Sequence, residues 1–530
     1  MNTRNAYVLR ARAAAPSGGR RRGALPQTSG GSAAARPAVA AVPSPRQPVS
    51  ATSAQPAPAS QPERVGQHAL VDRAANARLA FCERSVKGRF DIIVPTLKEV
   101  SALQHEPDFP ARAQALAMKQ LGHTLPADIL ENAWVAGLDL KSLYAYCTFA
   151  ALKNSAARFA EDLKSQAESV QDAQNFFLDC GFHAVDISPC ADGRLKGLMR
   201  YILRLPVTSL TRRTAYAGAM FDVESNVSHW VATELSRFRE GVPTTADAGT
   251  RYLKVAVYHT SSSQPASEGC AAHGSNEHKA MEAALERLYQ FRQAIENAFC
   301  CGASTDLLLI GVDTDTDAIK VHVPDADGNL SAYRFVDNAK LYRDTLGLDA
   351  NAARLAVYEA VRQASQASGW GAGNGEPHDG MRRLIINLLI NNFSQIEYMN
   401  EQYGGRYPDI GHAERYVIVG DGIEEVQMRN ISYYAHLNTV EEGAADLDVG
   451  IKIFKGLNVK RGLPIPVAIH YRYDHRVPGS RDRAVAKAQR VQAAIRARYP
   501  ELSAAGMLVC HLSVQDLPMG SPIEDVEGER

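Results

Sequence analysis

The chain has 530 residues, 45% of them apolar and 22% charged, which is enough for about two to four packed domains. Basic and acidic residues balance at 58 each, so no general attraction to nucleic acid or to a membrane surface is expected. No stretch approaches the ~20 apolar residues of a membrane-spanning helix. The eight cysteines are scattered, which favours a reduced intracellular compartment over a disulfide framework.

Residues 1–66 form a first segment that is rich in Ala, Pro, Ser and Gly. It carries nine arginines, one glutamate and neither Lys nor Asp, a net charge of about +8. Such a segment buries too little apolar surface to offset its ordering entropy, so we expect a disordered basic arm. A solvated tail, a docking arm for an acidic partner surface, an organelle transit peptide and an RNA-binding segment all stay open for it.

Residues 67–168 follow with a helical pattern and little strand signal. Apolar residues recur three or four positions apart, which places them on one helix face. This spacing joins Leu97 to Val100 and Leu103, and Leu143 to Tyr146, Phe149 and Leu152. The pattern predicts an all-helical domain.

From residue 169, short apolar runs alternate with helical stretches. Buried strands are predicted at 182–187, 252–258 and 307–312, and the helix before the third strand carries an apolar stripe from Met281 to Phe299. Continuous apolar strands separated by helices imply a sheet covered on both faces. The fold class is therefore α/β (α+β), and we place this domain at 169–405.

The last part of the chain, residues 406–530, repeats this scheme. The run 416–422 is similar to the strand that leads into Cys190, and the run 466–471 is similar to the strand that ends at His259. In this alignment Val419 replaces Cys190, Ile423 replaces Arg194 and Tyr471 replaces His259. We expect a second α/β domain that has lost its metal, although short apolar strands also resemble one another by chance.

Three residues of the 169–405 domain, Cys190, His259 and Cys270, are candidate metal ligands. Cys190 and His259 each end a predicted strand, and ligands gather at that edge of an α/β sheet. Two thiolates and one imidazole suit zinc, and a fourth position left for water is the pattern of a catalytic site. On spacing alone, a structural cysteine and a core histidine are the alternative. Asp192 and Arg194 follow closely, and a carboxylate held by a guanidinium beside a metal can handle protons.

The string from Cys190 to Arg194, followed by a strand-end histidine and a further cysteine, resembles the metal and Asp–Arg signature of β-class carbonic anhydrases. Longer strings are similar to a narrower group, the carboxysomal (shell-associated) carbonic anhydrases, and the resemblance covers about residues 67–530. These strings are Phe177 to Ser188, Cys270 to Gly274, Cys300 to Ser304 and Gly411 to Tyr416. Ten residues separate His259 from Cys270, where the ordinary β-class has about two, and the carboxysomal group shares this insertion.

The resemblance implies reversible hydration of carbon dioxide by zinc-bound hydroxide, with one Zn²⁺ per chain. Asp192 would accept a hydrogen bond from that hydroxide, and Arg194 would keep Asp192 ionised and away from the metal. Within the family's Gly411–Tyr416 string, His412 is the candidate proton relay. A domain-junction histidine without a proton role is the alternative.

The family also implies a helical domain followed by two α/β domains that pack like the subunits of an ordinary β-class dimer. It places the protein in the carboxysome, a bacterial cytoplasmic microcompartment, where it would supply carbon dioxide to Rubisco. We expect a homodimer or higher homo-oligomer, an arm that docks on Rubisco, contacts with shell proteins, and no nucleic-acid or membrane partner. A non-catalytic, zinc-stabilised scaffold between shell and Rubisco is the competing interpretation.

Two further patterns stand near the candidate ligands. Asp313, Asp315 and Asp317 alternate like the start of a calcium loop, but the loop's required Gly and Glu are absent, so we expect no calcium site. His183 and His273 flank the ligand strings. Each is either a support for the metal ligands or a core residue.

Overall fold

The structure, a computed structural model, describes residues 67–530 apart from 242–249, 300–303, 368–372, 410, 424–427, 438–439, 519 and 527–530. All of these lie in the unit Val65–Arg530. The predicted basic arm, residues 1–66, lies outside the described residues, as do residues 300–303 of the family string. Within the described ranges, no helix is both long and apolar enough to span a bilayer.

The chain is helical from Arg73 to Asp179, which confirms the predicted N-terminal helical region. Local signals explain the ends: Asp72 caps the first helix by accepting from the Ala75 N–H at 2.9 Å, and Gly122 ends α4 with a φ of +75°. The helices are α2 (Arg73–Asp91), α3 (Ile93–Ala102), α4 (Phe109–Leu121), α5 (Ala127–Glu131), α6 (Ala133–Ala136), α7 (Leu140–Ser165) and α8 (Ala167–Asp179).

The first sheet has the strand order β2-β1-β3-β4-β5-β6, and its first four strands are parallel. β1 and β3 are buried over nearly their whole length, and most of their residues are apolar. The two buried charges in them, Asp186 and Lys254, form an ion pair at 3.1 Å. The strands are β1 (Ala184–Pro189), β2 (Thr211–Arg213), β3 (Arg251–Thr260), β4 (Ser304–Asp313), β5 (Ile319–His322) and β6 (Phe335–Asp337); the helices are α9 (Val223–Arg239), α10 (Glu277–Phe299), α11 (Asn338–Thr345), α12 (Ala350–Ser365) and α13 (Asp379–Tyr403).

The second sheet has the order β11-β10-β9-β7-β8, parallel except for the edge strand β11. Two mixed sheets after a helical region confirm the predicted α/β class. The strands are β7 (Tyr416–Gly420), β8 (Ser432–Ala435), β9 (Ile465–Tyr473), β10 (Leu508–Asp516) and β11 (Ile523–Val526), and the helices are α14 (Val440–Leu457), α15 (Ser480–Arg498) and α16 (Pro500–Ala504).

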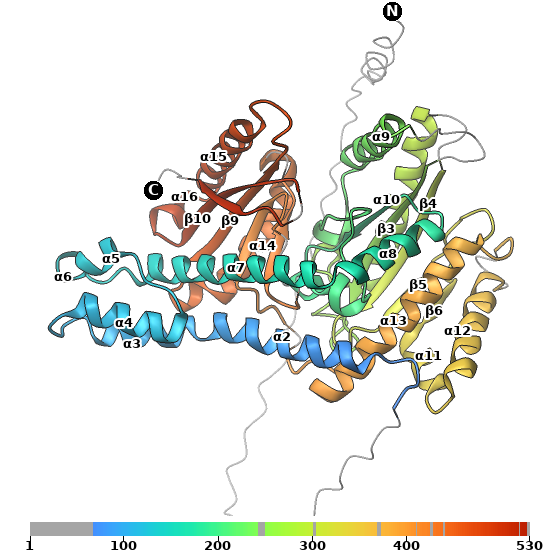
Figure 1. Ribbon diagram of the computed structural model, residues 1–530, viewed down its shortest axis with the longest axis horizontal. Helices are drawn as coiled ribbons and strands as arrows, with labels where there is room; N and C mark the ends of the chain where they lie inside the picture. The colour runs from blue at the N-terminus through green and yellow to red at the C-terminus, as the bar shows by residue number, and fades with distance from the viewer. Residues whose placement is uncertain are drawn as a thin grey trace, which may run out of the picture. The chain divides into compact units, whose positions relative to one another are not determined.

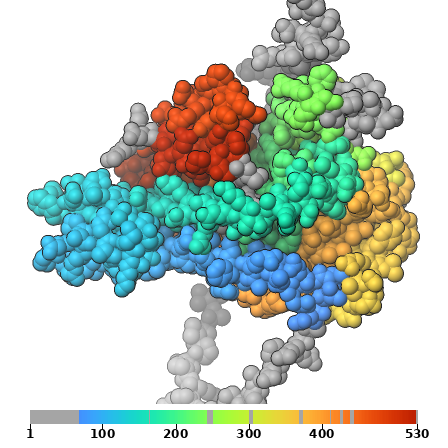
Figure 2. All heavy atoms as spheres, viewed as in Figure 1, coloured from blue at the N-terminus to red at the C-terminus, as the bar shows by residue number. Residues whose placement is uncertain are grey.

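The helical region shares its hydrophobic core with the second sheet. Helix α7 contacts both β9 and β10, and the Phe149 ring of α7 stacks on His511 at 4.8 Å. The Phe90 ring at the end of α2 stacks on Tyr416 of β7 at 5.8 Å. Figure 1 shows α7 running beside both α2 and this sheet, and Figure 2 shows the turquoise segment packed between the blue and the red segments. The first sheet has a separate core.

The strand register of the first sheet places the end of β1 beside the end of β3. Pro189 lies opposite Val257 in the parallel pair. Counting two residues further along both strands puts His259 level with Ala191, the residue that follows Cys190.

The register of the second sheet corrects one detail of the predicted repeat. Gly420 lies opposite His470. If Val419 stands for Cys190, then Gly420 stands for Ala191, and His470 occupies the place of His259. The assignment of Tyr471 to that place was wrong by one residue, because a continuously apolar strand does not reveal its register.

The place in the second sheet that corresponds to His259 carries a hydrogen-bonded histidine. His470 is buried and its Nδ1 contacts the Ser513 hydroxyl at 2.9 Å. Among the described residues, none of the clusters of His, Cys, Asp and Glu that could hold an ion includes His470. A different cluster in this part of the chain, Asp474, His475 and Asp516, brings three possible ligand atoms within 4.8 Å of one another, so the second domain without metal stays a prediction.

Candidate metal centre

Cys190 and His259 lie at the carboxyl ends of two neighbouring parallel strands. Cys190 directly follows β1, where its N–H donates to the Val257 carbonyl at 3.1 Å, and His259 is the last residue but one of β3. Parallel strands bring their carboxyl ends to one edge of the sheet, so these two side chains meet. Cys270 comes from the loop after β3 and precedes the 3-10 helix η4 (Ala271–His273).

The three predicted ligands converge. One ligand atom from each of Cys190, His259 and Cys270 lies within 4.8 Å of the other two, and the two sulfurs are 3.9 Å apart. In a tetrahedral zinc site, Zn–S bonds of about 2.3 Å hold two sulfurs roughly 3.8 Å apart. His259 is 1% exposed, yet neither ring nitrogen has a hydrogen-bond partner among the described residues. Buried imidazole nitrogens are ordinarily bonded, so this donor set fits a metal cation.

The protonation of the two thiols is coupled. Their mutual hydrogen bond, followed by burial, raises the pKa of Cys190 well above its usual value, and the same hydrogen bond lowers the pKa of Cys270. The Cys190 thiol is thus the group of the pair that holds its proton more tightly. A divalent cation would take the place of that proton, because metal ligation requires both groups as thiolates.

Gly218 links the two segments that carry the cysteines. Its N–H donates to the Cys190 Sγ at 3.3 Å, and its carbonyl accepts from His273 Nε2 at 3.2 Å. Its φ is +66°, and a Cβ there would lie 2.6 Å from His273 Nε2, so glycine is required on both counts. His273 thus supports the ligand segments, whereas His183 lies at the opposite end of β1 and accepts from the Arg251 N–H.

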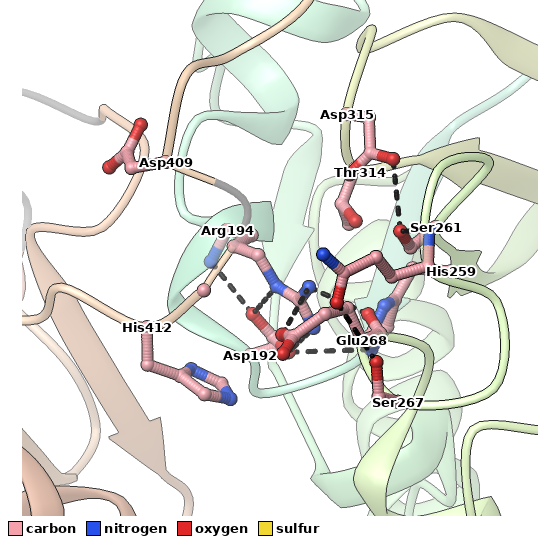
Figure 3. A network of polar contacts seen from close by, with 12 residues as sticks. Asp192, Arg194, His259, Ser261, Ser267, Glu268, Thr314, Asp315, Asp409 and His412 are labelled. Atoms are coloured by element: carbon pink, nitrogen blue, oxygen red, sulfur yellow. Dashed lines mark hydrogen bonds and ion pairs between the residues drawn. The ribbon is translucent and has the colours of Figure 1, made fainter. Parts of the chain in front are cut away.

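The loop that carries Cys270 is anchored by Asp315. Its Oδ2 accepts from the Ser261 hydroxyl at 2.9 Å and from the Ser263 N–H at 2.7 Å (Figure 3). Burial alone would raise the pKa of Asp315, but these serine hydrogen bonds hold it below its usual value. Asp317 instead accepts from Gln395 and Tyr407. The carboxylates of Asp315 and Asp317 therefore accept hydrogen bonds from protein donors around this turn.

Asp192 and Arg194 form a buried pair directly beside the candidate ligands (Figure 3). Asp192 Oδ1 accepts from Arg194 Nε at 3.0 Å and Oδ2 accepts from Nη2 at 2.8 Å, which is the bidentate geometry of a strong ion pair. The Arg194 backbone N–H adds a third bond at 2.9 Å. Arg194 Nη1 also donates to the Glu268 carbonyl at 2.7 Å, so the guanidinium is held on both sides.

This pair fixes the charge of Asp192. Burial by itself would raise the pKa of this carboxyl, but the guanidinium of Arg194 and, further away, His412 and His259 hold it well below its usual range. Asp192 is therefore ionised near neutral pH. Its Oδ2 lies 3.6 Å from His259 Nε2, which places the carboxylate at the edge of the candidate metal centre.

His412 reaches the same site from the segment between α13 and β7. Figure 3 shows its ring pointing toward the Asp192–Arg194 pair. Its Nδ1 donates to Glu414 Oε1 at 2.8 Å, and ligand atoms of Asp192, His412 and Glu414 lie within 4.8 Å of one another. Burial lowers the pKa of His412, but the two carboxylates outweigh it and raise the pKa to about 9.

Three contributors were missed at the sequence level. Gly218 and Asp315 act through contacts with segments that no local pattern connects to them. Glu414 was named only as part of a family string, yet its carboxylate forms a hydrogen bond with His412 and lies close to Asp192. The alternation of His412 and Glu414 just before a strand was the one local signal that could have paired them.

Comparison with known proteins matches three family models along the chain. They are Carboxysome Shell Carbonic Anhydrase, N-terminal, at residues 68–160, the catalytic domain at 172–412 and the C-terminal domain at 413–530. The chain is 56% identical over 473 residues to the carboxysome shell carbonic anhydrase of Halothiobacillus neapolitanus, covering 89% of this chain and 92% of that protein. It is 49% identical over 473 residues to that of Prochlorococcus marinus (87% and 90% covered) and 46% identical over 469 residues to that of Hydrogenovibrio crunogenus (87% of each).

Proposed function

The chain belongs to the family of carboxysome shell carbonic anhydrases, and from that premise we propose how its own residues carry out the family's reaction. The protein catalyses the reversible hydration of carbon dioxide to bicarbonate in the carboxysome. This activity implies a metal cofactor, and the Cys190–His259–Cys270 group is a possible site for one. We keep the division into parts 67–168, 169–405 and 406–530 as part of the proposal.

The proposed metal is one Zn²⁺ per chain, held by Cys190, His259 and Cys270. One observation supports this assignment. Two sulfurs and a buried imidazole, whose ring nitrogens have no hydrogen-bond partner among the described residues, converge within 4.8 Å. Bound zinc supplies a Lewis acid that makes water acidic enough to attack carbon dioxide near neutral pH.

Asp192 is the proposed orienting group for the attacking water. Both of its oxygens accept from Arg194, which leaves a carboxylate with fixed position and fixed charge beside the three ligands. Such a carboxylate can accept a hydrogen bond from the water and turn its lone pair toward carbon dioxide. Arg194 holds the carboxylate back from the ligands, because its own position is set by the Glu268 carbonyl.

His412 is the proposed proton relay between the site and solvent. Its side chain is 24% exposed, so the ring can contact both the buried Asp192 and bulk water. Dehydration of bicarbonate consumes one proton per turnover, and a histidine whose pKa is raised to about 9 is protonated and ready to donate at neutral pH.

The assembly is the remaining part of the proposal. The arm, with nine arginines and one glutamate, is suited to bind an acidic surface of Rubisco, and the protein forms a homodimer or higher homo-oligomer. Recruitment to Rubisco should weaken steeply as salt rises from 50 to 300 mM, roughly the range over which screening becomes strong. Equal recruitment of a chain that begins at residue 67 would contradict the arm assignment. Light scattering after size exclusion gives the oligomeric state.

Stopped-flow carbon dioxide hydration with zinc analysis tests the catalytic proposal. Wild type should contain about one zinc per chain and hydrate carbon dioxide, and Cys190→Ser should lose both. Cys510→Ser removes a cysteine outside the site and is the matched control. Zinc binding without any hydration in wild type would favour the scaffold interpretation. Full activity and full zinc in Cys190→Ser would overturn the ligand assignment.

A further inference from the structure

Glu414 joins the proton relay to the loop that follows the first metal ligand. Its side chain is fully buried, and it stands two residues before β7 in the second α/β part. Its Oε1 accepts the Nδ1–H of His412 at 2.8 Å and the N–H of Gly193 at 3.2 Å. One carboxylate oxygen therefore binds the histidine and the backbone between Asp192 and Arg194.

The space at Gly193 is shaped around this carboxylate. A Cβ at Gly193 would lie 2.4 Å from both Cγ and Oε1 of Glu414. The φ of Gly193 is not positive, so the backbone itself does not demand glycine. The close approach of Glu414, which packs against the loop of Asp192 and Arg194, explains why position 193 is a glycine.

The charges that face His412 favour its protonated form. Two carboxylates, Asp192 and Glu414, act on the ring from opposite segments, and Arg194 is the cation among them. Arg194 is already paired with both oxygens of Asp192. The Glu414 carboxylate forms its side-chain hydrogen bond with the imidazole, whereas Arg194 acts on it through its charge.

Glu414 also has unused bonding capacity. Its Oε2 is buried and has no hydrogen-bond partner among the described residues. A buried carboxylate with one oxygen bonded only to a histidine and an amide is costly unless the histidine carries charge. The energetics of Glu414 and the protonation of His412 are therefore linked.

We propose that Glu414 is a positioning residue for proton transfer, which keeps His412 protonated at Nδ1 and orients the ring so that Nε2 exchanges the proton. This rests on the proposed function of His412 as the relay. In the dehydration direction, bicarbonate and one proton give carbon dioxide and water. The Nε2–H bond of His412 breaks, and its proton goes to the oxygen that leaves bicarbonate as water. The ring becomes neutral, keeps its proton on Nδ1 and still donates it in the hydrogen bond to Glu414, and solvent then returns a proton to Nε2.

The test compares Glu414→Gln with Glu524→Gln in the full, zinc-loaded protein. The first variant keeps an acceptor for the Gly193 N–H but removes the charge. Glu524 also accepts two hydrogen bonds, from the Tyr473 hydroxyl and from Arg481 Nε, but it lies on the edge strand β11 and is not part of the site. The rates of carbon dioxide–bicarbonate interconversion and of proton-dependent release of labelled water are measured together by ¹⁸O exchange.

We expect Glu414→Gln to slow proton-dependent water release roughly 10- to 100-fold, with interconversion and zinc content within about twofold of wild type. Added imidazole should restore the lost rate, and Glu524→Gln should behave as wild type. Glu414→Asp, which keeps the charge, should recover part of the rate. A second readout that does not depend on activity is the NMR titration of His412, whose pKa should fall from about 9 toward its usual 6.5 in Glu414→Gln.

The remaining outcomes would contradict either this inference or the proposed function. If interconversion and water release fall equally in Glu414→Gln, Glu414 is only structural and the proposal is wrong. It is also wrong if His412→Asn slows water release while Glu414→Gln does not. If His412→Asn itself has no effect on water release, the relay role of His412 fails, and this inference fails with it. Absence of zinc or of interconversion in wild type would instead refute the proposed function.

Discussion

Replacing Gly193 by alanine should disturb the site by steric clash with Glu414. The new Cβ would lie 2.4 Å from two Glu414 atoms, whereas carbon atoms pack at about 3.5–4.0 Å. Glu414 is buried, and its Oε1 is bonded on two sides, so it cannot simply swing away. Overpacking of this kind costs about 1–3 kcal/mol.

Gly197 offers a matched control a few residues further along the chain. A Cβ at Gly197 meets its nearest atom, the Arg429 backbone nitrogen, at 3.4 Å, which is ordinary contact. Its φ of −78° suits alanine, so Gly197→Ala should be neutral or more stable by up to about 1 kcal/mol. The same substitution thus has opposite expected signs at two neighbouring glycines.

Scanning calorimetry of zinc-loaded protein measures the difference. Gly193→Ala should unfold at lower temperature than wild type, and Gly197→Ala should not. Adding Glu414→Ala removes the three Glu414 atoms that would clash, Cγ, Cδ and Oε1. The double variant should therefore lose less stability than the sum of the losses in the two single variants. Equal stability of Gly193→Ala and Gly197→Ala, or strict additivity in the double variant, would refute the packing argument.

Three further predictions follow from the same contacts. Arg194→Met leaves the buried Asp192 carboxylate without its cation, so we expect a stability loss of about 3–5 kcal/mol in urea unfolding and a large fall in hydration rate; a variant as stable as wild type would contradict the ion-pair account. Asp315→Asn weakens the anchor of the Cys270 loop, so zinc affinity in a chelator competition should fall roughly 10- to 100-fold, and unchanged affinity would show that the anchor is dispensable. The folded-state pKa of His412, about 9, lies above its unfolded value near 6.5, so His412 contributes stability fully below pH ~6.5 and loses it as pH rises through 9, up to roughly 3 kcal/mol. Urea unfolding of wild type between pH 6.5 and 9.5 should show this extra loss relative to His412→Asn, and parallel profiles would contradict it.

Two of the three ligand positions could be predicted from a local pattern. Cys190 and His259 lie at the ends of mainly apolar runs, and such runs become buried parallel strands whose ends meet. Cys270 was accessible only as a further cysteine in a loop and through the family resemblance. Its exact place depends on Asp315, which the sequence presents as part of an acidic turn.

Long-range contacts were beyond local patterns. The periodicity of the helical region correctly grouped Leu143, Phe149 and Leu152 of α7 as buried, whereas Tyr146 of the same predicted face is exposed. It did not identify the partner of this face, which is the second sheet. The assignment of Tyr471 was wrong because apolar strands carry no register signal, and only pairing of Gly420 with His470 revealed it. Glu414 and Gly193 are far apart in sequence, and their contact depends on how two α/β parts of the chain pack together.

X-ray absorption at the zinc edge of the purified protein reports which atoms bind the metal. We expect two sulfurs at about 2.3 Å and one nitrogen at about 2.0 Å around it, with one sulfur lost in Cys190→Ser and none lost in Cys510→Ser. A coordination shell without sulfur, or one unchanged by Cys190→Ser, would contradict the assignment of Cys190, His259 and Cys270 as the metal ligands.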